Sequence, residues 1–143
     1  MKENWIIPCN LKIFNLIEHF ATNNRVVWRN AFSIHEGDTV YIYIGSPISE
    51  IRYRCKVLTT QVDSKTLEEN SYAISKKKFN NYYSKREKYI IMEKECEYKE
   101  GCLPLADLRA HGLGQVQLQA RIDRNVLRFI EQKAPMSEVV TNA

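Results

Sequence analysis

Several aromatic side chains of this sequence lie beside positively charged ones. Trp28, one of two tryptophans, is followed directly by Arg29. An aromatic ring can stack on a flat ligand and a guanidinium can hold a phosphate, so the pair suits a surface that binds nucleic acid. A tryptophan beside an arginine is equally compatible with an ordinary packed residue that has a charged neighbour.

A second cationic group lies in the segment 37–57, which reads GDTVYIYIGSPISEIRYRCKV. Apolar residues alternate at period two on both sides of a Gly-Ser-Pro loop, which predicts two strands joined by a tight turn. In the second strand the alternation separates an apolar face from a cationic face formed by Arg52, Arg54 and Lys56. Such a face predicts either phosphate contact or a solvated surface.

Two further segments carry groups that suit nucleic acid. Lysines 76–78 lead into Phe79, Tyr82 and Tyr83, a combination found both in exposed loops and on surfaces that stack bases. In the segment 115–122, glutamines and Arg121 alternate with apolar residues, which predicts a strand. Its amides and guanidinium can bind water, base edges or phosphates.

The residue pattern favours a binding module over an enzyme. The three histidines, His19, His35 and His111, are far apart and have no carboxylates at metal-ligand spacing. The sequence has no glycine-rich phosphate loop and no nucleophile elbow. We therefore expect no catalytic residue, no metal and no cofactor, and we expect the four cysteines to be free thiols because no CxxC pair occurs.

Composition predicts one globular domain. The chain has 143 residues, 44% of them hydrophobic, and a formal net charge of +4 with a pI near 8.9, which leans toward polyanionic partners. No apolar run is long enough to span a bilayer and no leader-like segment follows the first residues, so we expect a cytoplasmic protein that does not contact the membrane.

The expected elements follow from periodicity and from end signals. A strand over 4–9 precedes a helix that is capped by Asn15 and Glu18 and ends near Ala21. A further strand is expected at 89–93, a short helix at 104–110, and a last helix capped by Asp123 that runs to Lys133. Residues 134–143 read as a tail or linker after a domain that covers 1–133.

Five stretches of the sequence together resemble a known family. WIIPCN, VVWRN, EGDTVYIYIGSP, IRYRCKV and DLRAHGLGQVQLQARI are similar to the EVE domain of the PUA-like superfamily, which also includes YTH and ASCH domains. The resemblance runs from about Trp5 to Glu131. More narrowly, WIIPCN, VYIYIGSP and IRYRCKV are similar to EVE domains that precede an HNH nuclease domain in modification-dependent (type IV) restriction endonucleases, which act in phage defence.

This resemblance implies a fold and a ligand. The fold would be α+β, a curved mixed sheet or pseudo-barrel of five or six strands flanked by helices. The ligand would be duplex DNA with 5-methylcytosine or 5-hydroxymethylcytosine, whose modified base is flipped into an aromatic pocket while a separate HNH domain carries any cleavage. The pocket residues implied are Cys9, Asn10, Trp28, Tyr43, Gly45 and Ser46, with Tyr72, Tyr82 and Tyr83 as candidates for a second aromatic wall.

Phosphate contacts would come from cations around this pocket. The residues expected to hold the DNA backbone are Arg29, Arg52, Arg54, Lys56, His111 and Arg121. Two alternatives stay open: a reader of modified RNA, as in the YTH branch, and a protein-interaction module that uses Tyr41 and Tyr43. Salt dependence separates the second, because nucleic-acid binding weakens steeply as ionic strength rises.

Overall fold

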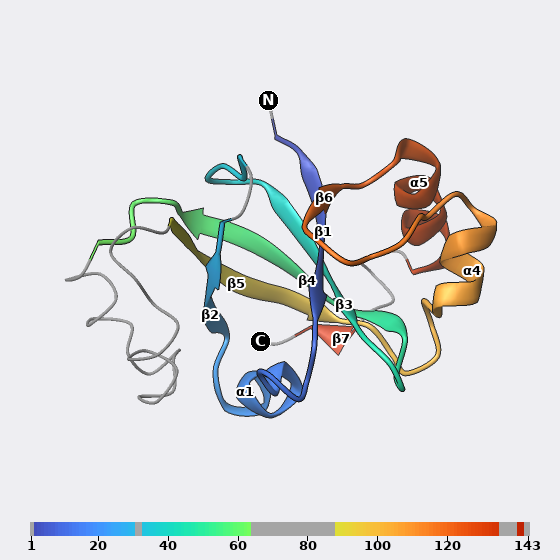
Figure 1. Ribbon diagram of the computed structural model, residues 1–143, viewed down its shortest axis with the longest axis horizontal. Helices are drawn as coiled ribbons and strands as arrows, with labels where there is room; N and C mark the ends of the chain where they lie inside the picture. Colours follow the sequence, from blue (N-terminus) through green and yellow to red (C-terminus); the bar gives the residue numbers. More distant parts are fainter. Residues whose placement is uncertain (1, 31–32, 64–87, 135–139, 142–143) are drawn as a thin grey trace.

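The computed structural model describes residues 2–30, 33–63, 88–134 and 140–141 (Figure 1). Their strands and helices are, in chain order, β1 (Asn4–Cys9), α1 (Leu16–Thr22), β2 (Arg25–Arg29), β3 (Thr39–Ile44), β4 (Glu50–Thr59), β5 (Tyr89–Glu97), α4 (Leu105–Ala110), β6 (Ala120–Arg121), α5 (Arg124–Lys133) and β7 (Val140–Thr141). The protein is thus α+β, as the sequence predicts.

The strands form one mixed sheet in the order β2-β5-β4-β3-β1-β6, and β7 pairs with the far end of β5. All neighbours are antiparallel except β1 and β3, which run parallel. The register shifts at three places in β3, β4 and β5, where extra residues bend and twist the strands. The predicted curved sheet is confirmed, and its hydrogen-bonded path does not close into a barrel.

Both faces of the sheet are covered by apolar packing. Val40, Ile42 and Ile44 of β3 belong to an inner cluster with Leu16 and Phe20 of α1. The alternate residues Tyr41 and Tyr43 belong to an outer cluster. This cluster includes Leu108 of α4 and Val126 and Ile130 of α5. All six residues of β3 are therefore buried, because neither face of this strand is exposed to solvent. Figure 1 shows α1 well apart from the α4 and α5 pair.

The predicted helix ends are confirmed. The Asn15 side chain accepts a hydrogen bond from the Glu18 backbone N–H at 3.2 Å, and the Asp123 side chain accepts one from the Asn125 N–H at 2.8 Å. Each satisfies a donor that the first turn of a helix leaves unpaired. Pro104 precedes α4, as expected for a residue without an N–H.

Two sequence predictions are wrong in extent. Within the predicted strand 115–122, only Ala120 and Arg121 pair, with Ile6 and Trp5 of β1, so the amides do not form a ladder. Ile13, although it is spaced from Leu16 and Phe20 as on one face of a helix, precedes α1 and is 55% exposed. In addition, Val140 and Thr141 of the expected tail form β7.

The described part of the chain has no helix that is long and apolar enough to cross a membrane. Its four cysteines carry free thiols, and three of them, Cys9, Cys55 and Cys96, are buried. Burial raises the pKa of the Cys55 and Cys96 thiols, so both stay protonated and pack as small apolar side chains.

A buried carboxylate fixes the start of β1 to the start of β3. Asp38 accepts hydrogen bonds from the Trp5 indole at 2.9 Å, the His35 N–H at 2.9 Å and the Glu3 N–H at 3.0 Å. Desolvation alone would raise the pKa of this carboxyl, but the donors outweigh it and the pKa is lowered. The carboxylate therefore stabilises the fold above its ordinary pKa of 3.8, and that stability is lost as the pH falls below this value.

We predict that Asp38→Asn lowers the free energy of unfolding by about 1–3 kcal/mol at pH 7, because an amide offers one acceptor oxygen to donors that need two. Urea denaturation measures the change. Glu36→Gln, an exposed neighbour, is the matched control and should stay within about 0.5 kcal/mol of the unsubstituted protein. Equal stability of the two variants would show that the Asp38 network contributes nothing.

Candidate functional site

The curved sheet leaves a seam between its two end strands, β2 and β6. Side chains bridge this seam in place of strand pairing. The buried amide of Gln119, just before β6, donates a hydrogen bond from Nε2 to the backbone carbonyl of Arg29 at the end of β2. Gln119, one of the alternating glutamines of the segment 115–122, thus holds the two edges together.

The indole of Trp28 lies beside this bridge and stacks on Phe14. The ring centroids are 5.9 Å apart and the ring planes differ by 16°, an offset-stacked pair. Phe14 belongs to the segment between β1 and α1, so the stack ties this segment to β2. Both rings are partly buried and pack on the inner cluster, so the indole is neither sealed in the core nor fully exposed.

The start of α1 fixes the position of Phe14. Phe14 directly precedes the capping residue Asn15, and His19 is the fourth residue of the capped turn. The Phe14 and His19 rings meet edge to face at 5.4 Å, as in a hydrophobic staple. The Phe14 N–H also donates to the Asn10 carbonyl at 3.0 Å. Sequence reasoning missed Phe14, and its place immediately before a cap was the available signal.

His19 links this helix to the Trp28 strand. Its Nε2 lies 2.7 Å from the carbonyl oxygen of Arg25, the first residue of β2. Burial lowers the pKa of His19, outweighing the opposite effect of the Arg25 carbonyl. A neutral ring donates its Nε2 hydrogen to that carbonyl, so the contact needs no charge.

A buried lysine fixes the other end of α1. Lys94 of β5 donates from Nζ to the Phe20 carbonyl at 2.9 Å, and its ammonium lies 5.0 Å from the centroid of the Phe20 ring. A cation near the last carbonyls of a helix is favourable. Burial lowers the pKa of Lys94, and the protein compensates for this desolvation with the carbonyl and the ring.

Four of the predicted pocket residues lie together where the parallel strands β1 and β3 end. The Gly45 N–H donates to the Cys9 carbonyl at 3.0 Å. Asn10 and Ser46 follow these residues and are exposed. The Cys9 thiol is buried and lies 3.5 Å from the Phe14 carbonyl, so this group connects through Phe14 to Trp28. The Asn10 carbonyl oxygen Oδ1 accepts the Lys12 N–H at 2.9 Å, which leaves its Nδ2 to face a ligand.

The predicted pairing of Trp28 with Tyr43 in one wall is wrong. Trp28 packs on the inner cluster, whereas Tyr43 lies in the outer cluster under α4 and α5. The two rings are on opposite faces of the sheet, because Tyr43 alternates with the inward residues Ile42 and Ile44. The other candidates for a second wall, Tyr72, Tyr82 and Tyr83, lie outside the described residues.

The cationic face of β4 is not an open surface, which corrects the sequence interpretation. Arg52 pairs with Glu50 at 3.3 Å, and Arg54 pairs with Glu95 of β5 at 3.1 Å. Arg54 also donates to the Tyr41 hydroxyl, and Lys56 donates to the Thr39 hydroxyl at 3.2 Å. The Arg52 and Arg54 side chains are only 15% and 21% exposed. Their role in phosphate binding stays a prediction, and their carboxylate partners would have to give way for it.

Arg29 and Arg121, like His111, are exposed members of the set predicted to contact the DNA backbone. Arg121 lies 3.0 Å from the Glu3 carboxylate, and its guanidinium lies 5.4 Å from the centroid of the Trp5 ring. With 64% of the Arg121 side chain exposed, this ion pair adds little to stability and can exchange its partner for a phosphate. Both arginines adjoin the seam.

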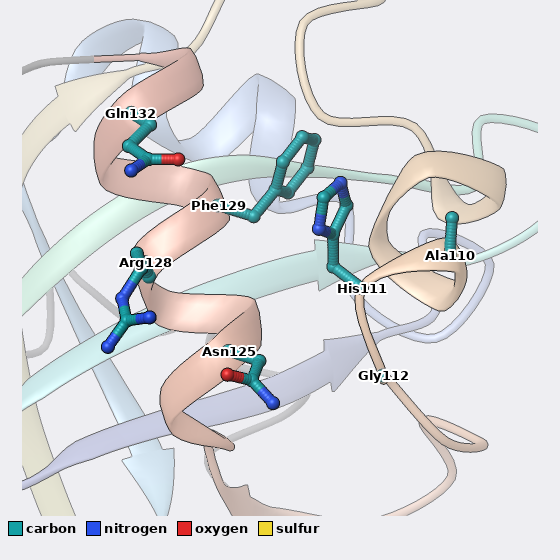
Figure 2. A pocket seen from close by; sticks show the side chains of 7 residues that line it. All are labelled: Ala110, His111, Gly112, Asn125, Arg128, Phe129 and Gln132. Atoms are coloured by element: carbon teal, nitrogen blue, oxygen red, sulfur yellow. The ribbon is translucent and has the colours of Figure 1, made fainter.

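The last predicted residue, His111, lies elsewhere, at the end of α4. Its ring stacks on Phe129 of α5, with centroids 4.1 Å apart and planes 12° apart. Figure 2 shows the His111 ring beside the Phe129 ring of α5. Both residues line an open hollow of about 510 Å³. The other lining residues are Ala110, Gly112, Asn125, Arg128 and Gln132. A guanidinium and two amides in this hollow suit an anionic or polar group.

In the described residues, no group of three or more histidine, cysteine, aspartate or glutamate side chains is placed to hold a metal ion. The groups gathered at the seam are aromatic rings, an asparagine amide and arginines. Their chemistry is stacking, hydrogen bonding and charge neutralisation.

The curved sheet with one parallel pair and helices on both faces defines a PUA-like fold. The structure is similar to the ASCH protein of Zymomonas mobilis: one variant of that protein matches with a TM-score of 0.70 at 13% identity, covering 92% of this chain and 96% of that one. The unsubstituted form gives 0.63 at 14% identity and covers 97% of both chains.

A protein from Leishmania major shares the same fold, with a TM-score of 0.60, 13% identity, and coverage of 92% of this chain and 94% of that chain. No protein-family model matches the sequence, and no curated protein matches it. At these identities the similarity establishes the fold alone, which is the curved α+β sheet expected from the sequence.

We predict that acid weakens the α1 to β2 junction through His19. The pKa of His19 is lower in the folded chain than its ordinary value of 6.5, so protonation favours unfolding as the pH falls below 6.5. The free energy of unfolding should therefore fall less between pH 7 and 5 in His19→Gln than in the unsubstituted protein. The same slope in both proteins would contradict the assignment.

Proposed function

We propose that the chain is a reader of modified cytosine, which binds duplex DNA and stacks a flipped 5-methylcytosine or 5-hydroxymethylcytosine at the Trp28 seam. The observation that carries the proposal is the partly buried indole, fixed against Phe14 at the point where the two edges of a curved sheet meet. The sequence resemblance to EVE domains and the PUA-like fold support it.

Energetics favour an aromatic site of this kind. Extruding a base from a duplex costs roughly a few kcal/mol, and stacking on an aromatic side chain returns about 1–3 kcal/mol per base. Phe14 restrains the indole before a ligand arrives, so less conformational entropy is lost on binding. A modified base that stacks better or fits more closely then gains over an unmodified one.

Polar groups at the ends of β1 and β3 are placed to bind the edge of the base. The Nδ2 group of Asn10 can donate to N3 or O2 of cytosine, while its Oδ1 is held by Lys12. Ser46, exposed beside it, supplies a hydroxyl that can donate or accept. The backbone at Cys9 and Gly45, joined by a hydrogen bond, makes this rim rigid.

Arg29 and Arg121 are the cations that we assign to the DNA backbone. Both are exposed and lie on strands that border the seam, so they can hold phosphates on either side of an extruded nucleotide. His111 would contact the backbone only where the DNA extends over the α4 and α5 layer. In the full protein we propose that this domain directs an HNH nuclease to modified phage DNA.

Replacing Trp28 tests the proposal most simply. We predict that Trp28→Ala weakens binding to a duplex with one 5-methylcytosine by about 10- to 100-fold, and removes the preference over unmodified duplex, because the stacking surface is lost. Trp28→Phe should retain part of the preference. Fluorescence anisotropy with matched duplexes and RNA oligonucleotides gives the affinities, and tighter binding to modified RNA would favour the YTH-like alternative.

Two variants serve as controls for this measurement. Arg29→Gln should weaken modified and unmodified DNA equally and reduce the salt dependence by about one unit of slope. Tyr43→Phe, on the opposite face of the sheet, should change neither affinity nor preference. An unchanged preference in Trp28→Ala would show that the pocket is elsewhere, and salt-independent binding to a protein would favour an interaction module.

A further inference from the structure

Two large apolar side chains of the described residues are conspicuously exposed: Leu118 is 69% exposed and Ile13 is 55% exposed. Single exposed apolar residues are common and need no explanation. Each of these two residues, however, directly precedes a residue that contacts β2. Ile13 precedes Phe14, which stacks on Trp28, and Leu118 precedes Gln119, which bonds to the carbonyl of Arg29.

Each of the two residues is thus next to a residue that contacts β2, the strand of Trp28. A duplex that delivers a base to Trp28 must lie against this rim. Apolar side chains there would meet the base stack, and not the phosphates, because the phosphates are drawn to Arg29 and Arg121. A base that leaves the stack opens a gap lined by the flat faces of its neighbours, and filling it with an apolar group restores contact.

We propose that Leu118 enters the duplex and fills the place of the flipped base. The proposal rests on the function proposed above and adds the residue that stabilises the open duplex. Leu118 is favoured over Ile13 by its surroundings. Ile13 lies in a turn in which its N–H donates to the Asn10 carbonyl at 3.0 Å and the next residue, Phe14, is stacked on Trp28, so this segment is fixed by the contacts that position the aromatic pair.

Leu118 has a different setting, on the connection from α4 to β6. Shortly after the end of α4, the Leu113 N–H donates to the Leu108 carbonyl. The connection is fixed again where the Gln119 amide donates to the Arg29 carbonyl. Gln117 is exposed beside Leu118. Its amide carries both a donor and an acceptor, which match the edge of the guanine that loses its cytosine partner. An apolar tip between amides suits a side chain that replaces a base.

The test compares Leu118→Ser with Ile13→Ser in the full chain, using fluorescence anisotropy. Three probes each carry one 5-methylcytosine: a duplex with guanine opposite it, a duplex with an abasic site opposite it, and a single strand. We expect Leu118→Ser to weaken binding to the matched duplex about tenfold and to leave single-strand binding unchanged. The loss should be smaller with the abasic duplex, because extruding an unpaired base costs less. Ile13→Ser should change all three by less than about twofold.

Thermal denaturation checks that both variants fold, which their exposed positions favour. If the unsubstituted chain prefers modified duplex but Leu118→Ser binds the matched duplex as tightly, the role of Leu118 is overturned while the reader function stands. An equal loss on the single strand would also overturn it, since a wedge acts only on a duplex. If the unsubstituted chain shows no preference, the reader function fails and the wedge fails with it.

Discussion

The fold depends on how the two end strands of an open, curved sheet are held together. No backbone ladder joins β2 to β6: the Gln119 amide makes the join with a side chain, and the Phe14–Trp28 stack ties β2 to the segment between β1 and α1. Side-chain contacts of this kind leave a partly exposed aromatic ring at the seam, where a closed ladder would leave only backbone. We propose that a planar ligand binds at this place, where the sheet does not close.

Helix α1 gives this seam its precision. Its first turn places Phe14 through the Asn15 cap and the His19 ring, and its last carbonyls are bound by Lys94 from β5. The helix is thus tied to β2, which carries Trp28, and to its neighbour β5. The inner cluster fills the space between, so the indole is oriented before any ligand binds, and the entropy lost on binding is small.

Much of the fold could be predicted from local sequence signals, because caps, alternation and proline act over a few residues. The ends of both capped helices and the central pair of strands follow from such signals. The pairing of strands could not be predicted from the sequence. This pairing determines whether the cationic face of β4 is open, because β5 places glutamates beside the arginines of β4 and Glu95 pairs with Arg54. Cys9, Asn10 and Gly45, which the resemblance assigns to one pocket, are neighbours in the structure, but the side of the sheet on which Tyr43 lies depends on the helices that cover it.

The central claim is that a nucleobase reaches the Trp28 indole. The chain has two tryptophans, so a nitrogen-15 correlation spectrum contains two indole N–H signals, and Trp28→Phe identifies the one that belongs to Trp28. During titration with duplex DNA that carries one 5-methylcytosine, the account predicts a saturable shift of the Trp28 signal that an unmodified duplex does not produce at the same occupancy. A Trp28 signal that stays in place while the modified duplex binds would contradict it.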